Sequence, residues 1–574
     1  MTRKCISIAM ALMLALTAVT AAWGQSFYIG GYKAVRDDLN GIWLCSIPRE
    51  YFGEDWAIDV QLDSTWGKTR MNGCYIADGE ALTFESIAGG KHYPVIATIN
   101  GETVTGSITF TWLPVMELNG DFGYEYTEGT VSLSDPNGTY REDMRAKLKW
   151  RGGLTNGPNS HKRNYSIKFL DKETGEKQNR RLLGMRKDNH WKLDGGQIDP
   201  LRLRNRVCSD LWLDMARQPW YAEQDPTVVN GSHGKTAEVI LNGSYQGIFG
   251  VIEPVDRKQL ALVQHDTVAN EFHGQQWACK LLEPTWKLPP YDNNSETWNG
   301  FEVSYPDFED VVPTDWSTLH DAFEFARACD AVDDYETFAE HVGEYFDIPV
   351  MEDYFILIVA TQALDNESKN IHYSCRDKTA DPRLTLTAWD LDISLGAQSQ
   401  PYLTPDIVSP ERPVDWFNNV PLGNIFFNSP KHRQEIIDRY RQLRETWLNT
   451  DSLVARVQRA VEELELCGAA AREEARWSHD SDLGGKALDI SAEAAYVTEW
   501  IQRRMAYLDE YIFVDKVIVP GDVDGNGIVD VSDASTLIDI LLNGASAGPN
   551  ADVDGNGVVD VSDISTLIDM LMGK

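Results

Sequence analysis

The sequence predicts a multidomain chain with a small N-terminal β-domain, an α+β domain with a helical C-terminal half, and a C-terminal module with two helices. Three observations support this prediction. The chain has 574 residues, which exceeds the usual size of one hydrophobic core. Its apolar periodicity changes along the chain from short strand patterns to long amphipathic helix patterns. Finally, one acidic, glycine-containing stretch occurs twice, at 522–533 and 552–563.

The first region, residues 25–109, contains short β-branched and aromatic runs that are separated by Gly, Asn and Asp. Within it, residues 91–110 have the pattern of a β-hairpin, because an Asn-Gly pair separates two alternating apolar runs. Residues 110–512 form the second predicted domain, with strands at 165–169 and 238–241 and mostly helices after about residue 315. We expect a linker at 513–520 and the C-terminal module at 521–574.

Residues 1–24 have the pattern of a signal peptide. Arg3 and Lys4 precede an apolar run over residues 6–19, and an Ala-x-Gly site comes before Gln25. The apolar run is too short to span a bilayer, and the rest of the sequence has no long apolar run. We therefore predict a secreted protein of the extracellular space or a cell-surface complex, without a membrane span.

The composition limits the partners. The chain carries 52 basic and 88 acidic side chains, which gives a formal net charge of −36. Such a charge argues against a nucleic acid or an anionic membrane as the main partner. It is compatible with a protein that binds cations. An apolar content of 43% supplies enough material for packed cores.

Cysteines give little guidance. Removal of the signal peptide takes away Cys5 and leaves seven, without CxxC spacing or any suggestion of a zinc site. Cys45 and Cys74 lie in the same N-terminal region and are candidates for a disulfide. The other five are predicted to be scattered, mostly buried thiols: Cys208, Cys279, Cys329, Cys375 and Cys467.

The repeated stretch has the spacing of a calcium-binding loop. Calcium takes six to eight oxygen ligands, and a loop of twelve residues supplies them from positions 1, 3, 5, 7, 9 and 12, with glycine at position 6. Gly527 and Gly557 occupy position 6 in the two copies. The predicted ligands of the first loop are Asp522, Asp524, Asn526, the carbonyl of Ile528, Asp530 and Asp533. Those of the second are Asp552, Asp554, Asn556, the carbonyl of Val558, Asp560 and Asp563.

An amphipathic helix follows each loop, and we expect the two helices to bury their apolar faces against each other. These faces consist of Ala534, Leu537, Ile538 and Leu541 in the first helix and Ile564, Leu567, Ile568 and Leu571 in the second. The loop–helix pair resembles a type I dockerin. The resemblance implies a module that folds around two Ca²⁺ ions and docks onto a cohesin domain of a scaffoldin or surface protein.

Several polar segments of the middle domain suggest phosphoryl transfer. ALDNESKNIHYSC (363–375) contains Asp365 and Asn370 with the spacing of the catalytic-loop Asp and Asn of protein kinases. TAWDLD (387–392) places two aspartates after a strand-like run, and alternation along a strand would point both to one face. On the predicted strand at 165–169, Tyr165, Ile167 and Phe169 face one way, while Ser166 and Lys168 face the other.

Together these segments resemble the CotH-type kinases, the family of spore-coat protein H. The motifs that support the resemblance are LPVMEL (113–118), WRGG with KRNYSIKF (150–169), WKLDGGQIDPLRLRN (191–205), NGSYQGIFGVIEPVD (242–256), the Asp-x4-Asn segment, WDLD, and Arg476-Trp477. The resemblance covers about residues 110–512. It implies an atypical kinase-like fold that transfers phosphate from ATP to protein Ser or Thr with Mg²⁺ or Mn²⁺.

The resemblance also implies roles for individual residues. Asp365 would be the catalytic base, and Asn370 would be a Mg²⁺ ligand. Asp390 would bind the Mg²⁺ that bridges the phosphates, with Asp392 as the other candidate.

The implied nucleotide site uses a second set of residues. Lys168 and Glu253 would form the pair that clamps the nucleotide, and the loop of Arg151, Gly152 and Gly153 would cover its phosphates.

Two other functions remain open on the sequence. The first is a catalytically silent kinase-like component of an extracellular, cellulosome-like complex, with docking or adhesion as its function. Extracellular ATP is scarce, and dockerins commonly accompany polysaccharide-degrading modules, so a place in polysaccharide catabolism fits this alternative. The second is a glycoside hydrolase, which requires two carboxylates across a sugar-binding cleft. The sequence names no such pair.

Overall fold

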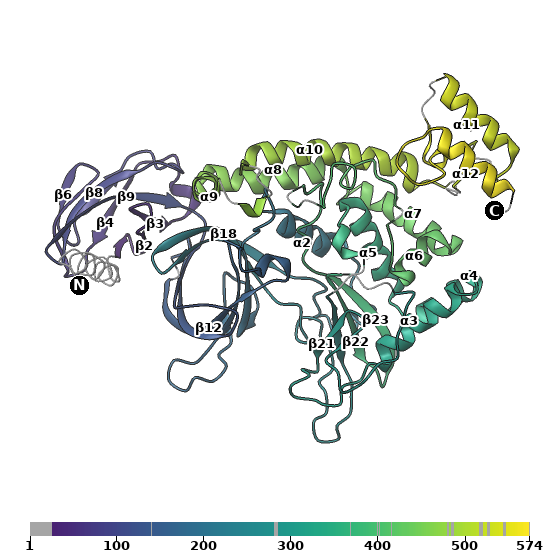
Figure 1. Ribbon diagram of the computed structural model, residues 1–574. Coiled ribbons are helices and arrows are strands. Elements are labelled where there is room, and N and C mark those ends of the chain that lie inside the picture. Colours follow the sequence, from purple (N-terminus) through teal and green to yellow (C-terminus); the bar gives the residue numbers. More distant parts are fainter. Residues whose placement is uncertain are drawn as a thin grey trace, which may run out of the picture. The chain divides into compact units, whose positions relative to one another are not determined.

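The structure is a computed structural model, and its described residues fall into two compact units (Figure 1). The first unit contains residues 26–203, 233–254 and 458–494, and the second contains 204–232, 255–457 and 495–572. The predicted signal peptide lies outside the described residues. These are 26–138, 140–280, 285–367, 369–398, 400, 402–414, 416–478, 481–483, 487–515, 520–524, 529–543 and 547–572.

The first unit begins with a nine-stranded sheet, which confirms the predicted N-terminal β-rich region. The strand order is β6-β5-β8-β9-β3-β2-β1-β4-β7. Its strands are β1 (Phe27–Ile29), β2 (Tyr32–Asp37), β3 (Ile42–Ser46), β4 (Trp56–Gln61), β5 (Trp66–Met71), β6 (Cys74–Ile76), β7 (Ala81–Phe84), β8 (Tyr93–Ile99) and β9 (Glu102–Thr111). The predicted hairpin is confirmed as β8–β9, whose turn residues Asn100 and Gly101 have φ values of 52° and 85°. Asn-Gly tolerates these positive angles, which match the twist of a two-residue hairpin.

The candidate disulfide between Cys45 and Cys74 does not form, and both thiols are free. Cys45 lies on β3 and Cys74 on β6, and β5, β8 and β9 separate these two strands in the sheet. Neighbouring strands lie about 4.8 Å apart, whereas a disulfide needs a Cα separation of at most about 7 Å. The two cysteines belong to the same N-terminal region of the sequence, but their strands are too far apart in the sheet for a disulfide.

A closed barrel follows, with the strand order β10-β11-β12-β13-β16-β18-β17 (Figure 1). Its strands are β10 (Val115–Asn119), β11 (Thr127–Ser134), β12 (Tyr140–Arg151), β13 (Asn164–Phe169), β16 (His190–Asp194), β17 (Gly234–Leu241) and β18 (Ser244–Ile252). A short hairpin, β14 (Arg180–Arg181) and β15 (Lys187–Asp188), is inserted before β16. Tyr165, Ile167 and Phe169 of β13 belong to the barrel core, so the predicted alternation along this strand is confirmed.

Helix α9 (Ala469–Trp477) packs on β18 through buried polar contacts. The Glu473 carboxylate accepts hydrogen bonds from Lys162 Nζ (2.6 Å), Arg202 Nε (2.7 Å) and the Ile248 amide (2.7 Å). The side chains of Lys162, Arg202 and Glu473 are all 0% exposed. One carboxylate thus neutralises two cations that have no access to water.

The second unit combines helices with a five-stranded sheet of order β20-β21-β19-β22-β23. The strands are β19 (Gln275–Cys279), β20 (Thr297–Trp298), β21 (Phe301–Tyr305), β22 (Ile371–Asp377) and β23 (Asp381–Ala388). The helices of the domain are α2 (Arg204–Met215), α3 (Ser317–Asp330), α4 (Tyr335–His341), α5 (Ile348–Thr361), α6 (Val420–Phe427), α7 (Pro430–Arg444), α8 (Thr450–Leu466) and α10 (Ile490–Tyr507). The predicted helical C-terminal half is confirmed, with the β22–β23 hairpin inserted between α5 and α6.

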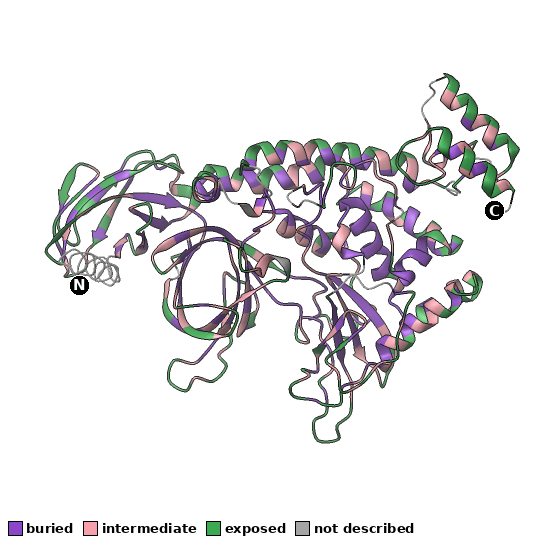
Figure 2. Cartoon of the chain, viewed as in Figure 1, coloured by how far each residue is buried: buried purple, intermediate pink, exposed green. Residues whose placement is uncertain are grey.

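Helix α5 is apolar on nearly all sides and is buried from Val350 to Thr361 (Figure 2). It ends at Gln362, whose φ of 48° reverses the chain direction. The short η4 helix (Leu364–Asn366) follows at once. A rigid buried helix therefore fixes the position of the segment that begins at Asp365.

The C-terminal module has helices α11 (Val531–Asn543) and α12 (Val561–Leu571), each directly after an acidic loop. Leu537 and Leu567 are completely buried in its small core. Ile538 and Ile568 are 42% and 44% exposed, so the prediction that both complete apolar faces pack against each other is wrong for these two residues. A module this small buries only part of its apolar surface.

We expect Glu473→Ala to destabilise the first unit by about 3–5 kcal/mol, because the substitution removes the carboxylate that pairs with the buried charges of Lys162 and Arg202. Chemical denaturation followed by tryptophan fluorescence measures this difference. Glu462→Ala, at an exposed position of α8, is the control and should change the free energy of unfolding by less than about 0.5 kcal/mol. Equal effects of the two substitutions would contradict the assigned role of Glu473.

Candidate functional site

The barrel has a cationic face, defined here by Lys149 and Arg151 on β12, Lys168 on β13 and Lys192 on β16. The register pairs Lys149 with Ser166, Ser166 with Lys192, and Lys168 with His190, which places these side chains together on the side opposite the barrel core. Lys149 Nζ and Lys168 Nζ lie 4.8 and 4.6 Å from the centre of the Tyr126 ring. Lys168 is therefore one of several cations on a continuous surface, which the sequence alone did not indicate.

His190 lies within this face and is nearly buried. Its Nε2 atom contacts Lys192 Nζ at 3.0 Å and Ser166 Oγ at 2.8 Å. Burial and the nearby charges of Lys192, Lys168, Arg151 and Arg186 hold the pKa of His190 well below its usual value. Since the Lys192 ammonium only donates, Nε2 accepts and the ring is neutral. The surrounding cations thus favour an anion at this surface and disfavour a further positive charge.

The glycine loop begins where β12 ends. Gly152 has a φ of +121°, and a Cβ atom at this position would lie 2.2 Å from Thr155 Oγ1. Residue 152 must therefore be glycine, for conformational and steric reasons. Space around Gly153 is open, since no heavy atom lies within 4 Å of a Cβ built there. Backbone amides in such a loop can approach a phosphate closely.

Glu253 follows β18 and is buried. Its carboxylate accepts hydrogen bonds from the Arg186 amide (2.6 Å) and His233 Nδ1 (3.1 Å). Burial alone raises the pKa of Glu253, but these bonds outweigh burial and hold the pKa below its usual value. Lys168 lies on β13, which pairs with one edge of β16, and Glu253 directly follows β18, which pairs with the other edge. The two residues therefore lie on opposite sides of β16.

In the second unit, Asp365 lies in η4 and forms an ion pair with Lys369, with 2.6 Å between Oδ2 and Nζ. Asn366 is completely buried, and its Nδ2 atom donates to the carbonyls of Asn370 (3.2 Å) and Trp389 (2.7 Å). The loop that carries Asp365 and Asn370 is thereby tied to the segment that carries Asp390. Lys369 was missed from the sequence, although its position next to Asn370 and four residues after Asp365 was an available signal.

Asn370 and Asp390 both adopt left-handed backbone conformations, with φ values of 57° and 56°. Asn370 Nδ2 lies 3.4 Å from the Asp390 carbonyl, and the Trp389 amide donates to the Asn370 carbonyl. Asn205 Nδ2 lies 3.4 Å from Asp390 Oδ1, and Asn205 Oδ1 accepts from the Leu391 amide. Positive φ at two facing non-glycine residues is strain of the kind that collects at functional sites.

The argument that Asp390 and Asp392 alternate along a strand is wrong. β23 ends at Ala388, and neither aspartate lies on a strand. Burial, and then the charges of Asp365 and Asp392, raise the pKa of Tyr402 to about 12. The Asp390 carboxylate faces Asn205, whose Nδ2 atom lies 3.4 Å from Oδ1. Nothing in the sequence pattern singled out Tyr402.

The described residues contain three groups of at least three ligating side chains whose donor atoms all lie within 4.8 Å of one another. Asp365, Asp390 and Asp392 do not form such a group. Two of the three groups belong to the repeated loops and consist of Asp522, Asp524 and Asp533, and of Asp552, Asp554 and Asp563. The structure thus brings together positions 1, 3 and 12 of each predicted calcium loop.

The position-12 aspartates organise both loops. Asp533 is buried and accepts hydrogen bonds from the amides of Asp524 and Asp530, and Asp563 does the same for Asp554 and Asp560. Burial, followed by the neighbouring Asp563 and Asp554 carboxylates, raises the pKa of Asp552. This direction shows that the loop concentrates negative charge.

Of the remaining predicted calcium ligands, some have contacts in the structure and others lie outside the described residues. Asp530 and Asp560 accept from the amides of Ser532 and Ser562 at the starts of the helices. Asn556 accepts from the Val558 amide, and Gly557 has the positive φ (84°) expected at position 6. Asn526, Gly527 and Ile528 lie outside the described residues.

The fold and these sites define a barrel-and-helix domain with polar loops on its helical unit, followed by a two-loop acidic module. Two family models match these parts: CotH kinase protein over residues 148–508 and Dockerin type I domain over residues 520–572. The chain belongs to the CotH kinase protein family and ends in a type I dockerin domain. A search of curated proteins finds no match.

The dockerin match limits the setting in which the protein acts. Type I dockerin domains typically bind calcium, imply partners of the cohesin type, and occur in extracellular or cell-surface complexes. Among the described residues, no helix combines the length and the apolar character that crossing a membrane requires.

Proposed function

We propose that the protein is a secreted kinase with a kinase-like fold that transfers the γ-phosphate of ATP to Ser or Thr of a protein and is docked through its dockerin onto a cohesin-bearing scaffold. The main observation behind the proposal is the joined pair of loops in the second unit. These loops hold Asp365, Asn370 and Asp390 through the buried Asn366 side chain and two strained backbone positions. The match to the CotH kinase protein family supports phosphate transfer as the reaction.

Asp365 is the proposed base. In this reaction the substrate hydroxyl gives its proton to Asp365, its oxygen forms the bond to the γ-phosphorus, and the bond from phosphorus to the β–γ bridging oxygen breaks to release ADP. Lys369 is well placed to orient the Asp365 carboxylate and to balance its charge before substrate arrives. Its ammonium group is then available to the transferred phosphoryl oxygens.

Asn370 and Asp390 are the proposed ligands of Mg²⁺ or Mn²⁺, with Asp392 as the second carboxylate. Amide and carboxylate oxygens are the donors that these hard cations prefer, so the residues present fit the ion. When bound, the ion would neutralise charge on the phosphates. Asn205 would orient the Asp390 carboxylate through its amide nitrogen.

The cationic face of the barrel is the proposed site for the ATP phosphates. Lys168 and Arg151 belong to the predicted nucleotide site, and the face adds Lys149 and Lys192 to them. A local cluster of cations in a chain with a net charge of −36 favours a bound anion. Glu253 keeps a proposed role at the end of β18, where it fixes the Arg186 backbone.

The dockerin is the proposed attachment module, with one Ca²⁺ in each loop. The carboxylate clusters support a bound cation in each loop. Docking is supported by apolar side chains that remain exposed on α11 and α12. These are Val531, Ile538, Leu542, Val561, Ile568 and Met570.

A second candidate function is a catalytically silent kinase-like component of a polysaccharide-associated complex, with docking or adhesion as its activity. The Asp365–Lys369 ion pair favours it, because the Asp365 carboxylate already has a partner where the substrate hydroxyl would have to bind. The two candidates differ in whether Asp365 is needed for phosphate transfer.

Asp365→Asn should lower the transfer of labelled phosphate from ATP to protein by about 10²–10⁴-fold, because the amide cannot accept the hydroxyl proton. Binding of ATP should persist in calorimetry. Asp210→Asn is the control, since it also removes a carboxylate from an i,i+4 ion pair, with Arg206 at 2.7 Å, and it should retain activity. Full transfer by Asp365→Asn would refute the assigned base, and no transfer by the wild type would favour the silent component.

Lys192→Ala should weaken ATP binding by about 10-fold or more, since a hydrogen bond to a charged group contributes about 1.5–3 kcal/mol. Titration calorimetry with ATP and Mg²⁺ measures the dissociation constant. Lys172→Ala, at an exposed position of the same unit, should leave it unchanged. If the two variants bind ATP equally well, the cationic face is not the phosphate site.

Asp533→Asn should reduce the number of calcium ions bound per chain from two to one, since the substitution removes a buried carboxylate at position 12 of the first loop. Calcium titration of the full chain after treatment with chelator counts the sites. Asp539→Asn, on the exposed side of the same helix, should still bind two ions. An unchanged count in Asp533→Asn would show that the first loop does not use this ligand.

A further inference from the structure

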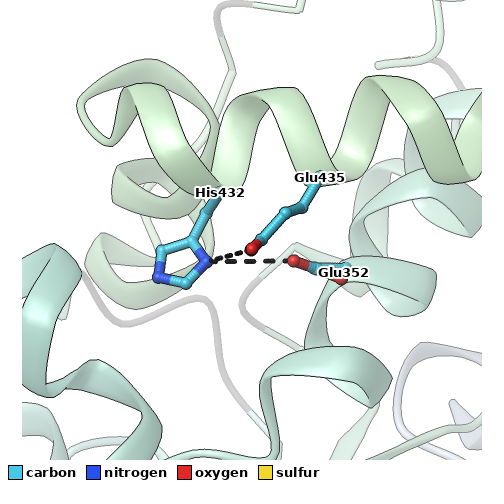
Figure 3. Close-up of side chains that lie close together, drawn as sticks. All are labelled: Glu352, His432 and Glu435. Atoms are coloured by element: carbon cyan, nitrogen blue, oxygen red, sulfur yellow. Dashed lines mark hydrogen bonds and ion pairs between the residues drawn. The ribbon is translucent and has the colours of Figure 1, made fainter.

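Three side chains outside the sites described so far converge between α5 and α7 (Figure 3). Glu352 comes from α5, and His432 and Glu435 come from the first turns of α7. His432 Nδ1 lies 2.8 Å from Glu435 Oε2 and 3.9 Å from Glu352 Oε1. One nitrogen and two carboxylate oxygens therefore point toward a common position.

The orientation of the His432 ring is set from its other side. His432 Nε2 lies 3.2 Å from the Ala339 carbonyl, which can only accept a hydrogen bond, so Nε2 carries the proton. This contact leaves Nδ1 turned toward the two carboxylates. Without a metal ion Nδ1 also carries a proton, since the Glu435 carboxylate only accepts; burial lowers the pKa of His432, but the interactions with Glu352 and Glu435 outweigh burial and raise it. A metal ion would replace the Nδ1 proton, and an Nε2–H bond to a backbone carbonyl is the usual orientation of a metal-binding histidine.

Glu352 provides an independent observation. Its side chain is only 4% exposed, and among the described residues Oε1 has no hydrogen-bond partner. Oε2 accepts from Arg217 at 2.9 Å, so the carboxylate is held with Oε1 aimed at the cluster. The contact of Oε1 with His432 Nδ1, at 3.9 Å, is too long for a hydrogen bond, and a bound cation would reduce the cost of burying this oxygen.

We propose that Glu352, His432 and Glu435 bind a divalent transition-metal ion, of which Zn²⁺ is the best match. Zinc takes one imidazole nitrogen and carboxylate oxygens at about 2.0–2.2 Å, commonly with a further position left to water. Small changes of the Glu435 rotamer would open the space, because this side chain is 47% exposed while the other two are nearly buried. Glu435 also gives the ion a route from solvent.

The site would hold α5 to α7. Helix α5 leads directly into the η4 segment that carries Asp365, so an ion that fixes α5 also restrains the point where that segment starts. The role assigned to the metal is structural. It does not depend on the proposed phosphate transfer.

The test uses the purified full chain with saturating Ca²⁺, so that the dockerin loops are filled before Zn²⁺ is added. Competition with a chromophoric zinc chelator gives the affinity and number of zinc ions, and thermal melting with and without Zn²⁺ gives the stabilisation. Glu435→Gln is the main variant, since this exposed position tolerates substitution. Glu352→Gln is the second.

A matched control exists in α4. His341 Nδ1 lies 2.8 Å from Glu344 Oε1, which repeats the His-x-x-Glu spacing and distance of α7, but both side chains are exposed. Within the part of the chain that the structure describes, these two residues belong to no group of three converging ligands. Glu344→Gln should therefore bind Zn²⁺ as the wild type does. Glu435→Gln and Glu352→Gln should each lose about tenfold or more in affinity for one zinc ion, and the rise in melting temperature with Zn²⁺ should disappear.

Either of two results would overturn the proposal. In the first, Glu435→Gln and Glu344→Gln bind Zn²⁺ with the same number and affinity as the wild type, which would place any bound zinc elsewhere. In the second, the folded wild type shows no zinc-dependent stabilisation beyond that of Glu435→Gln. The cluster would then be an ion pair of an imidazolium group with two carboxylates.

Discussion

The buried side chain of Asn366 is the contact on which the geometry of the acidic loops depends. Its Nδ2 atom bridges the carbonyls of Asn370 and Trp389, which belong to segments on either side of the β22–β23 hairpin. Since Tyr354 of α5 donates to the Asn366 carbonyl, the same residue also joins these loops to the most buried helix of the unit. The positions of the proposed base and metal ligands thus depend on the Asn366 side-chain amide and on helix α5. The same contacts stabilise the positive φ angles of Asn370 and Asp390.

The sequence predicted the parts of the fold that depend on local pattern. The β8–β9 hairpin followed from its Asn-Gly turn, and the helices α11 and α12 followed from the amphipathic pattern after each repeated loop. Closure of the barrel and the position of α9 against β18 depend on contacts between residues far apart in sequence, such as Glu473 with Lys162. No local pattern contains such contacts.

The candidate sites were predictable in the same uneven way. The Asp and Asn of the joined loops and the calcium positions have fixed spacing, so the sequence named them. Lys192 and Asn205 became candidates only when strand register and loop contacts placed them beside named residues. Without CxxC spacing the sequence suggested no zinc site. Glu352 is separated from His432 by 80 positions (432 − 352) and approaches it only because α5 packs on α7. Strand alternation failed at Asp390 because the strand ended two residues earlier.

The two units differ in the charge that each of them concentrates. On the first unit, Lys192, Lys168 and Arg151 surround a neutral His190 and help burial to lower its pKa. On the second unit, the loops joined through Asn366 carry Asp365 and Asp390. A local concentration of charge of one sign favours a ligand of the opposite sign. Each unit therefore offers, by itself, an electrostatic reason for the proposed anion or cation site, which a purely adhesive role would not require.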